Sequence, residues 1–96
     1  MTTDELLVRL HDLKSELKQQ FGIEEIALFG SYARGEAHAE SDVDIAILKM
    51  HLKDAFAIMD AREYLMKKLN KNVDIGTLKS MKTFIKNRIK KDFVYV

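Results

Sequence analysis

Residues 28–48 read LFGSYARGEAHAESDVDIAIL, and the rest of the chain is organised around this stretch. A continuous apolar run at 26–29 ends at a glycine, and a run of this length is more typical of a buried strand than of a helix. A second run at 43–48 is apolar on both faces, as a central strand covered on both sides should be. The sequence therefore predicts two strands joined by a polar connection.

The connection between these strands combines helix and loop signals. Ser31 has the position of an N-cap for a short helix at 31–34, and Gly35 is expected to end that helix. The polar residues at 36–41 predict a loop that leads into the second strand.

The flanking segments carry apolar residues at helical or strand period. Thr2 and Glu5 have the spacing of a capping box, and leucines recur at helical period up to Gly22, which predicts a helix over 3–20. Further along, the pattern predicts a helix at 52–69, a strand at 73–78, a helix at 80–91 and an edge strand at 93–96. Gly76, inside the third strand, indicates a bulge or a close backbone approach.

Methionines and histidines have structural interpretations here. Four methionines at helical or strand-end positions are expected to fill the core: Met50, Met59, Met66 and Met81. The three histidines share no metal-ligand spacing and are expected on the surface: His11, His38 and His51.

The order of elements predicts a small α/β fold with helices packed on a mixed sheet. The helix between the strands at 43–48 and 73–78 is long enough for a crossover, so these strands should be parallel. If Gly30 and Asp42 share a site, the first strand must run antiparallel to the second. The sheet would then be mixed.

Composition describes an ordinary globular chain. Its 96 residues are expected to form a single domain, 1–96, and 47% apolar with 32% charged residues argues against disorder. No apolar run approaches the roughly 20 residues that span a bilayer, and the N-terminus is acidic, so a cytoplasmic protein that does not engage membranes is expected. Cysteine is absent, which excludes disulfides and thiolate metal ligands. Pairing into homo- or hetero-oligomers is compatible with the apolar helices.

The net charge of +1 hides an asymmetry. Residues 1–44 hold ten acidic and four basic side chains, whereas residues 62–91 hold ten basic and two acidic ones. A basic half beside an acidic site favours a polyanionic ligand or partner, although lysines on exposed helix faces also serve solubility. The second explanation is the commoner one.

Asp42 and Asp44 are the first candidate site residues. They are two positions apart on a strand, so both carboxylates project from the same face, where they repel each other unless a cation compensates. Carboxylate oxygens suit a hard ion, Mg²⁺ or Mn²⁺. If the third strand lies parallel beside the second, Asp74 falls at the same end of the sheet. Three carboxylates would permit two metal ions, one holding a triphosphate and one polarising an attacking hydroxyl.

Gly30 and Ser31 are the second candidate group. A glycine permits close approach of an anion to the backbone, and a serine at a helix start presents a hydroxyl beside unpaired N–H groups. Arg34, one turn later, would add a charged donor to the same phosphates. Taken singly, each of these residues and each aspartate also has an ordinary structural role as a turn, cap or solvated strand end.

In combination the pattern is far more specific. Gly-Ser, ten residues, then Asp-x-Asp, with a strand on either side, resembles the signature of the nucleotidyltransferase superfamily of the DNA polymerase β type. FGSYARGEAHAESDVDIAIL resembles the minimal nucleotidyltransferases of prokaryotes, and so does the tail VDIGTLKSMKTFIKNRIKKDFVYV. The resemblance covers nearly the whole chain beyond the first helix.

The resemblance implies a role for each motif position. Gly30 and Ser31 would contact the β and γ phosphates of the nucleotide, and Asp42 and Asp44 would bind metal. Asp74 would hold the second metal and help to activate the acceptor hydroxyl. The implied reaction is attack on the α-phosphate of a nucleoside triphosphate with release of pyrophosphate.

Relatives of this size resemble the antitoxin of a two-gene toxin–antitoxin pair whose toxin is a HEPN-domain ribonuclease. The implied activity is Mg²⁺-dependent transfer of AMP from ATP to a tyrosine of that toxin. Direct binding of nucleic acid is not expected. Two alternatives stay open: a non-catalytic antitoxin that acts by contact alone, and nucleotidyl transfer to a small molecule or an RNA end.

Overall fold

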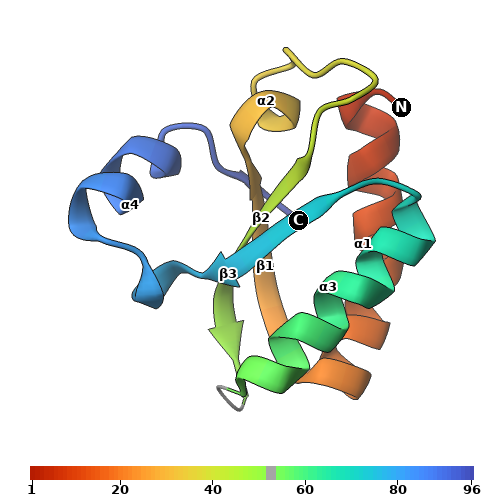
Figure 1. Cartoon of the computed structure of the whole chain (residues 1–96), viewed down its shortest axis with the longest axis vertical. Helices are drawn as coiled ribbons and strands as arrows, with labels where there is room; N and C mark the ends of the chain where they lie inside the picture. The colour runs from red at the N-terminus through yellow and green to blue at the C-terminus, as the bar shows by residue number, and fades with distance from the viewer. Residues whose placement is uncertain (52–53) are drawn as a thin grey trace.

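The structure is a computed structural model of the 96-residue chain, and it describes residues 1–51 and 54–96. Helices and strands alternate along the chain, and Figure 1 shows their arrangement. The elements run in the order α1 (Thr3–Phe21), β1 (Ile23–Phe29), α2 (Gly30–Ala33), β2 (Val43–Met50), α3 (Ala55–Leu69), β3 (Val73–Thr77), η1 (Leu78–Ser80), α4 (Thr83–Lys90) and β4 (Val94–Tyr95). Over those two described ranges, no helix is both long and apolar enough to cross a membrane.

The four strands form one mixed sheet in the order β3-β2-β1-β4. Strands β1 and β2 are antiparallel, and β2 and β3 are parallel, which confirms both predicted orientations. The two-residue strand β4 pairs antiparallel with β1, so the predicted edge strand exists but is shorter than 93–96. The bulge expected at Gly76 is wrong, because the β2–β3 register is unbroken; the register irregularities lie in β1 near Glu25. Among the described residues, the atom near a Cβ at Gly76 belongs to the Met81 side chain and not to a backbone.

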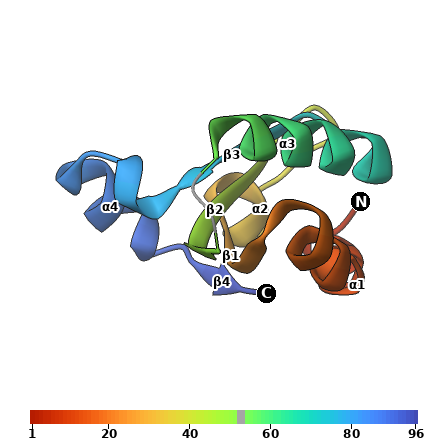
Figure 2. The same cartoon turned by 90° about the horizontal axis from the view of Figure 1, so that it is seen from below.

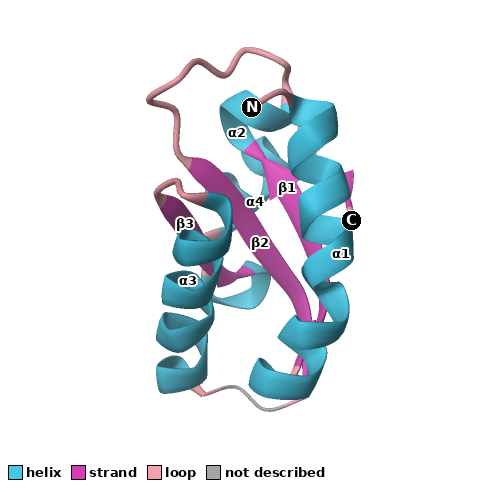
Figure 3. Ribbon diagram, turned by 90° about the vertical axis from the view of Figure 1, so that its right-hand side faces the viewer, coloured by secondary structure: helices cyan, strands magenta, loops and turns pink. Residues whose placement is uncertain are grey.

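One face of the sheet is covered by α1 and α3, which contact each other (Figures 2 and 3). The buried core lies between these helices and the sheet. Its members from β2 alternate along the strand, at Val43, Ile45 and Ile47, and each is at most 2% exposed. Alternation places the intervening residues of β2, including Asp44, on the opposite face.

Helix boundaries follow capping chemistry. Thr2 caps α1 by accepting from the backbone N–H of Glu5 at 3.2 Å, and Gly22 ends the helix in the left-handed region at φ 70°. Asp54 caps α3 by accepting from the backbone N–H of Phe56 at 2.9 Å, so α3 begins at Ala55. The start predicted for this helix, at residue 52, lies outside the described residues.

Other boundaries differ from the predicted ones because strand pairing or packing determines them. Strand β1 begins three residues before the predicted 26–29, since Ile23 pairs with Met50 even though two glutamates interrupt the apolar run. The third strand ends at Thr77, one residue before the predicted 78, because η1 begins at Leu78. The last helix, α4, is shorter than the predicted 80–91.

Helix α4 is the exception to the compact packing. It stands apart from α1 and α3 in Figures 1 and 2, and none of its residues is buried. Phe84 is 69% exposed on it. The core role expected for Met59 is also wrong, since this α3 side chain is 62% exposed, whereas Met50 and Met66 pack against the core. All three histidines are exposed, as predicted.

Candidate active site

The three predicted carboxylates lie at one end of the sheet. Asp44 of β2 is paired in register with Phe29 of β1 on one side and with Asp74 of β3 on the other. Residues in register on adjacent strands point to the same face. Asp42 lies one residue before β2, and its charge helps to raise the pKa of Asp44, so the two carboxylates are neighbours. The face is the one opposite α1 and α3.

Gly30 is required by its contact with Asp44. A Cβ at position 30 would lie 3.0 Å from Cγ of Asp44 and closer still to the Oδ2 atom. In addition, Gly30 has a φ of +75°, which L side chains rarely adopt. The close contact places the turn after β1 directly against the Asp44 carboxylate, so the Gly-Ser motif and the aspartate motif meet in space.

Ser31 is near the site, but its predicted capping role is wrong. Helix α2 begins at Gly30, its N-cap is Phe29, and no side chain caps it. Ser31 therefore lies within the single turn of helix rather than before it. Gly35 ends the turn as predicted, at φ +72°, and the N–H of Glu36 donates to the carbonyl of Ser31 at 2.9 Å.

The environment of Asp44 is unfavourable for a negative charge. Burial raises the pKa of its carboxyl first, and the charges of Asp74 and Asp42 raise it further, while Arg34 has a weaker opposing effect. A group held in this way is stabilised when a cation arrives. The cluster therefore has the electrostatic character of a cation site.

The donor set fits a divalent ion. Three carboxylates with no thiolate are hard ligands, which suit Mg²⁺ or Mn²⁺. In the described part of the chain, no three acidic, histidine or cysteine side chains already converge as a complete ligand set. Mg²⁺ normally completes its shell with substrate phosphates and water, so a partial protein ligand set is compatible with it.

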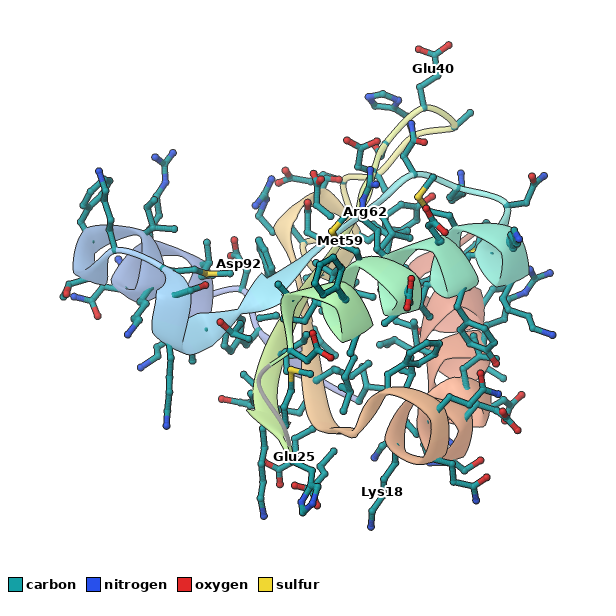
Figure 4. All side chains as sticks on the ribbon, turned by 60° about the horizontal axis from the view of Figure 1, so that its bottom comes forward. Lys18, Glu25, Glu40, Met59, Arg62 and Asp92 are labelled. Carbon is teal, nitrogen blue, oxygen red and sulfur yellow. The ribbon has the colours of Figure 1, made fainter. Side chains whose placement is uncertain are left out.

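Arg34 is engaged with two carboxylates. Its Nη1 lies 2.9 Å from Oδ2 of Asp92, and its Nε lies 3.1 Å from Oε2 of Glu36. These ion pairs, Asp92 first, raise the pKa of the guanidinium. Figure 4 labels Asp92 beside α4, so the pair ties the end of α4 to the turn after β1. The Arg34 side chain is 43% exposed, so it remains accessible to solvent despite both ion pairs.

A hollow of about 600 Å³ borders the site at Asp42. Its walls come from the loop before β2 and from the turn between α3 and β3, with residues Ala39, Glu40, Ser41, Asp42, Met66, Asn70, Lys71 and Asn72. Lys71 donates from Nζ to the carbonyl of Ala39 at 3.1 Å and holds the two walls together. Figure 4 shows Glu40 at the outer tip of this loop.

Several residues around the site were not predicted. Asp92 lies 58 positions from Arg34, and no local pattern relates them. Phe29 was assigned only to a strand, yet its ring packs against Phe93 with centroids 6.1 Å apart, beside the carboxylates. Met81 was expected in the core, whereas it is half-buried on the face of the site.

Comparison with known proteins agrees with this arrangement. The profile of the nucleotidyltransferase domain matches residues 10–96. The protein adenylyltransferase MntA of Thermococcus cleftensis is 36% identical over 96 residues, which is 100% of this chain and 97% of that protein.

Solved structures share the fold. A minimal nucleotidyltransferase matches with a TM-score of 0.82 at 21% identity, over 98% of this chain and 95% of its own. A chain of a toxin–antitoxin complex with AMP-PNP matches with a TM-score of 0.66 at 32% identity, over 81% of this chain and 61% of its own length. A chain from the complex of the tri-AMPylated Shewanella oneidensis HEPN toxin with MNT antitoxin matches with a TM-score of 0.62 at 24% identity, over 97% of this chain and 66% of its own length. The chain therefore belongs to the nucleotidyltransferase domain family.

Proposed function

We propose that this chain is a Mg²⁺-dependent protein adenylyltransferase that transfers AMP from ATP to a tyrosine hydroxyl of a HEPN-domain toxin, and thereby acts as its antitoxin. The observation that carries the proposal is the in-register placement of Asp44 and Asp74 with Gly30 packed against the Asp44 carboxylate. The full-length relationship to MntA supports protein adenylylation, and the complexes of related antitoxins with toxin or AMP-PNP support the partner and the nucleotide.

The chain's own groups have distinct parts in the reaction. The backbone at Gly30 and the hydroxyl of Ser31 would bind the β and γ phosphates, and Arg34 would exchange a carboxylate partner for a phosphate oxygen. Asp42, Asp44 and Asp74 would hold the metal ions, which supply neutralisation of phosphate charge and polarisation of the hydroxyl when bound. Catalysis is then mainly positioning and charge neutralisation.

The phenolic oxygen forms a bond to the α-phosphorus of ATP, and the bond from that phosphorus to the oxygen bridging the β-phosphate breaks. Pyrophosphate leaves with the bonding electrons. The phenolic proton passes to the carboxylate of Asp74, which lies on the exposed strand edge and can release it to water.

The test is transfer of labelled AMP from ATP to the cognate HEPN toxin. Label is expected on a tyrosine with Mg²⁺ present and is expected to disappear with a chelator. Asp42→Asn should abolish the label, whereas Asp60→Asn, an exposed acidic position on α3, should not. Absence of label with Mg²⁺ and with Mn²⁺ would contradict the proposal. Protection of cells by Asp42→Asn would favour a contact-only antitoxin instead.

A further inference from the structure

A cavity of about 210 Å³ opens on the face of the sheet that carries the carboxylates. Its lining consists of one carboxylate and otherwise apolar residues or backbone: Phe29, Ile45, Asp74, Ile75, Gly76 and Met81. Because the side chain of Ile45 belongs to the core beneath the opposite face, the strand backbone forms the floor at that position. The cavity is therefore a small apolar recess with a single acidic group.

Two apolar side chains form the walls. The ring of Phe29 is braced by Phe93, whose centroid lies 6.1 Å away at an interplanar angle of 47°. The methyl carbon of Met81 lies 3.9 Å from the position that a Cβ of Gly76 would occupy. Because Gly76 has no side chain, the Met81 methyl group lies close over the strand at this position, and the two residues together border the cavity. A methionine wall is also adaptable to the ligand that enters.

We propose that this cavity receives the aromatic ring of the acceptor and so makes the enzyme selective for phenolic over aliphatic hydroxyls. The inference rests on the proposed function and adds to it the residues that recognise the acceptor. A tyrosine side chain is an apolar ring with one O–H donor at its end, and the cavity pairs apolar walls with one carboxylate acceptor. With its ring between Phe29 and Met81, its hydroxyl meets Asp74.

Other occupants fit this lining less well. A serine or threonine hydroxyl would reach Asp74 but would leave the apolar walls in contact with water, and so would gain little from burial. An adenine ring could donate its 6-amino group to Asp74, but its acceptor ring nitrogens would find no donor among the lining side chains. The recess thus discriminates by matching one polar end and one apolar body.

A binding experiment tests the cavity without catalysis. The full chain with ¹³C-labelled methionine methyl groups is titrated with N-acetyl-tyrosinamide in the presence of Mg²⁺ and AMP-PNP. The Met81 methyl resonance is expected to move upfield from the ring current, and the exposed Met59 methyl serves as the control that stays in place. N-acetyl-serinamide should move neither. An unmoved Met81 resonance, or an equal response to both amides, would overturn the inference.

A matched pair of variants tests selectivity in the reaction. Gly76→Val places a β-branched side chain in the cavity on an edge strand that accepts such residues, while Thr77→Val alters the neighbouring position on the opposite face. Gly76→Val should raise KM for the tyrosine acceptor by at least about tenfold and leave KM for ATP unchanged, as expected for blocking an apolar pocket. Thr77→Val should change neither.

The outcomes separate this inference from the proposed function. If the unmodified chain labels the toxin but Gly76→Val leaves the acceptor KM unchanged, the cavity is not the acceptor site and the adenylyltransferase proposal stands. If Met81 responds selectively to the phenol but no AMP is transferred with Mg²⁺ or Mn²⁺, the cavity inference stands and the proposed reaction does not.

Discussion

The two faces of the sheet have opposite roles. On the face covered by α1 and α3, Val43, Ile45 and Ile47 are at most 2% exposed and belong to one apolar core. On the other face, one position away along the same strand, Asp44 lies between Asp74 and the turn at Gly30. Because side chains alternate between the two faces, alternate residues of β2 contribute to the core or to the candidate site. Substitutions on the core face should therefore lower the free energy of unfolding, whereas substitutions on the other face should reduce AMP transfer.

The largest expected effect is on the chemical face. Asp44→Asn should reduce AMP transfer by about 10³-fold, the upper end of the range for losing one electrostatic contact to developing charge. It should not lower the free energy of unfolding, because burial and neighbouring carboxylates already disfavour the charge of Asp44. Transfer assays and urea denaturation measure the two quantities. A large loss of stability would show that Asp44 is structural and would break the contrast between the faces.

The core face should respond in the reverse way. Leu65→Ala on α3 removes a side chain with 0% exposure and should lower the free energy of unfolding by about 2–5 kcal/mol. Transfer per folded molecule should be unchanged, since Leu65 does not contact the site. Met59→Ala, on the exposed side of the same helix, is the control and should stay within about 0.5 kcal/mol. Equal effects of the two substitutions would contradict the assigned packing of α3.

A pair of glycines tests whether Gly30 belongs to the site. Both Gly30 and Gly35 have positive φ, so an alanine at either should destabilise the fold by about 1–2 kcal/mol. Only at Gly30 would the new Cβ collide with Asp44; at Gly35 it meets open space. Gly30→Ala should also reduce transfer by about 10²-fold, as displaced catalytic groups do, whereas Gly35→Ala should not. Equal transfer rates in the two variants would remove Gly30 from the site.

The smallest effect concerns pH. The folded-state pKa of Asp44 is raised above its ordinary 3.8, so the folded state binds more protons than the unfolded state between these two values. The free energy of unfolding should therefore fall with rising pH across this window relative to Asp44→Asn, and the difference should level off above it. Urea denaturation with a chelator, from about pH 3 to pH 7, measures this. A difference independent of pH would contradict the burial assigned to Asp44.

Local patterns predicted much of the fold. The leucine spacing and the Thr2 cap gave the first helix, and Gly22 ended it as expected. The crossover rule gave the parallel β2–β3 pair, because a helix between two strands of one sheet brings them back in the same direction. Failures occurred where packing overrode pattern: Met59 has helical spacing but faces solvent, and Ser31 has a cap residue's chemistry but lies inside α2.

For the site, the sequence by itself determined which chemical groups are available and that the carboxylates of Asp42 and Asp44 are neighbours, because a separation of two residues along the chain is a local property. Only the tertiary structure decided which distant groups join them. The register of β3 pairs Asp74 with Asp44. The chain after α4 places Asp92 in contact with Arg34, and the segment after β3 places Met81 beside Gly76. These contacts depend on how strands and helices pack, and packing is a property of the whole chain rather than of any segment.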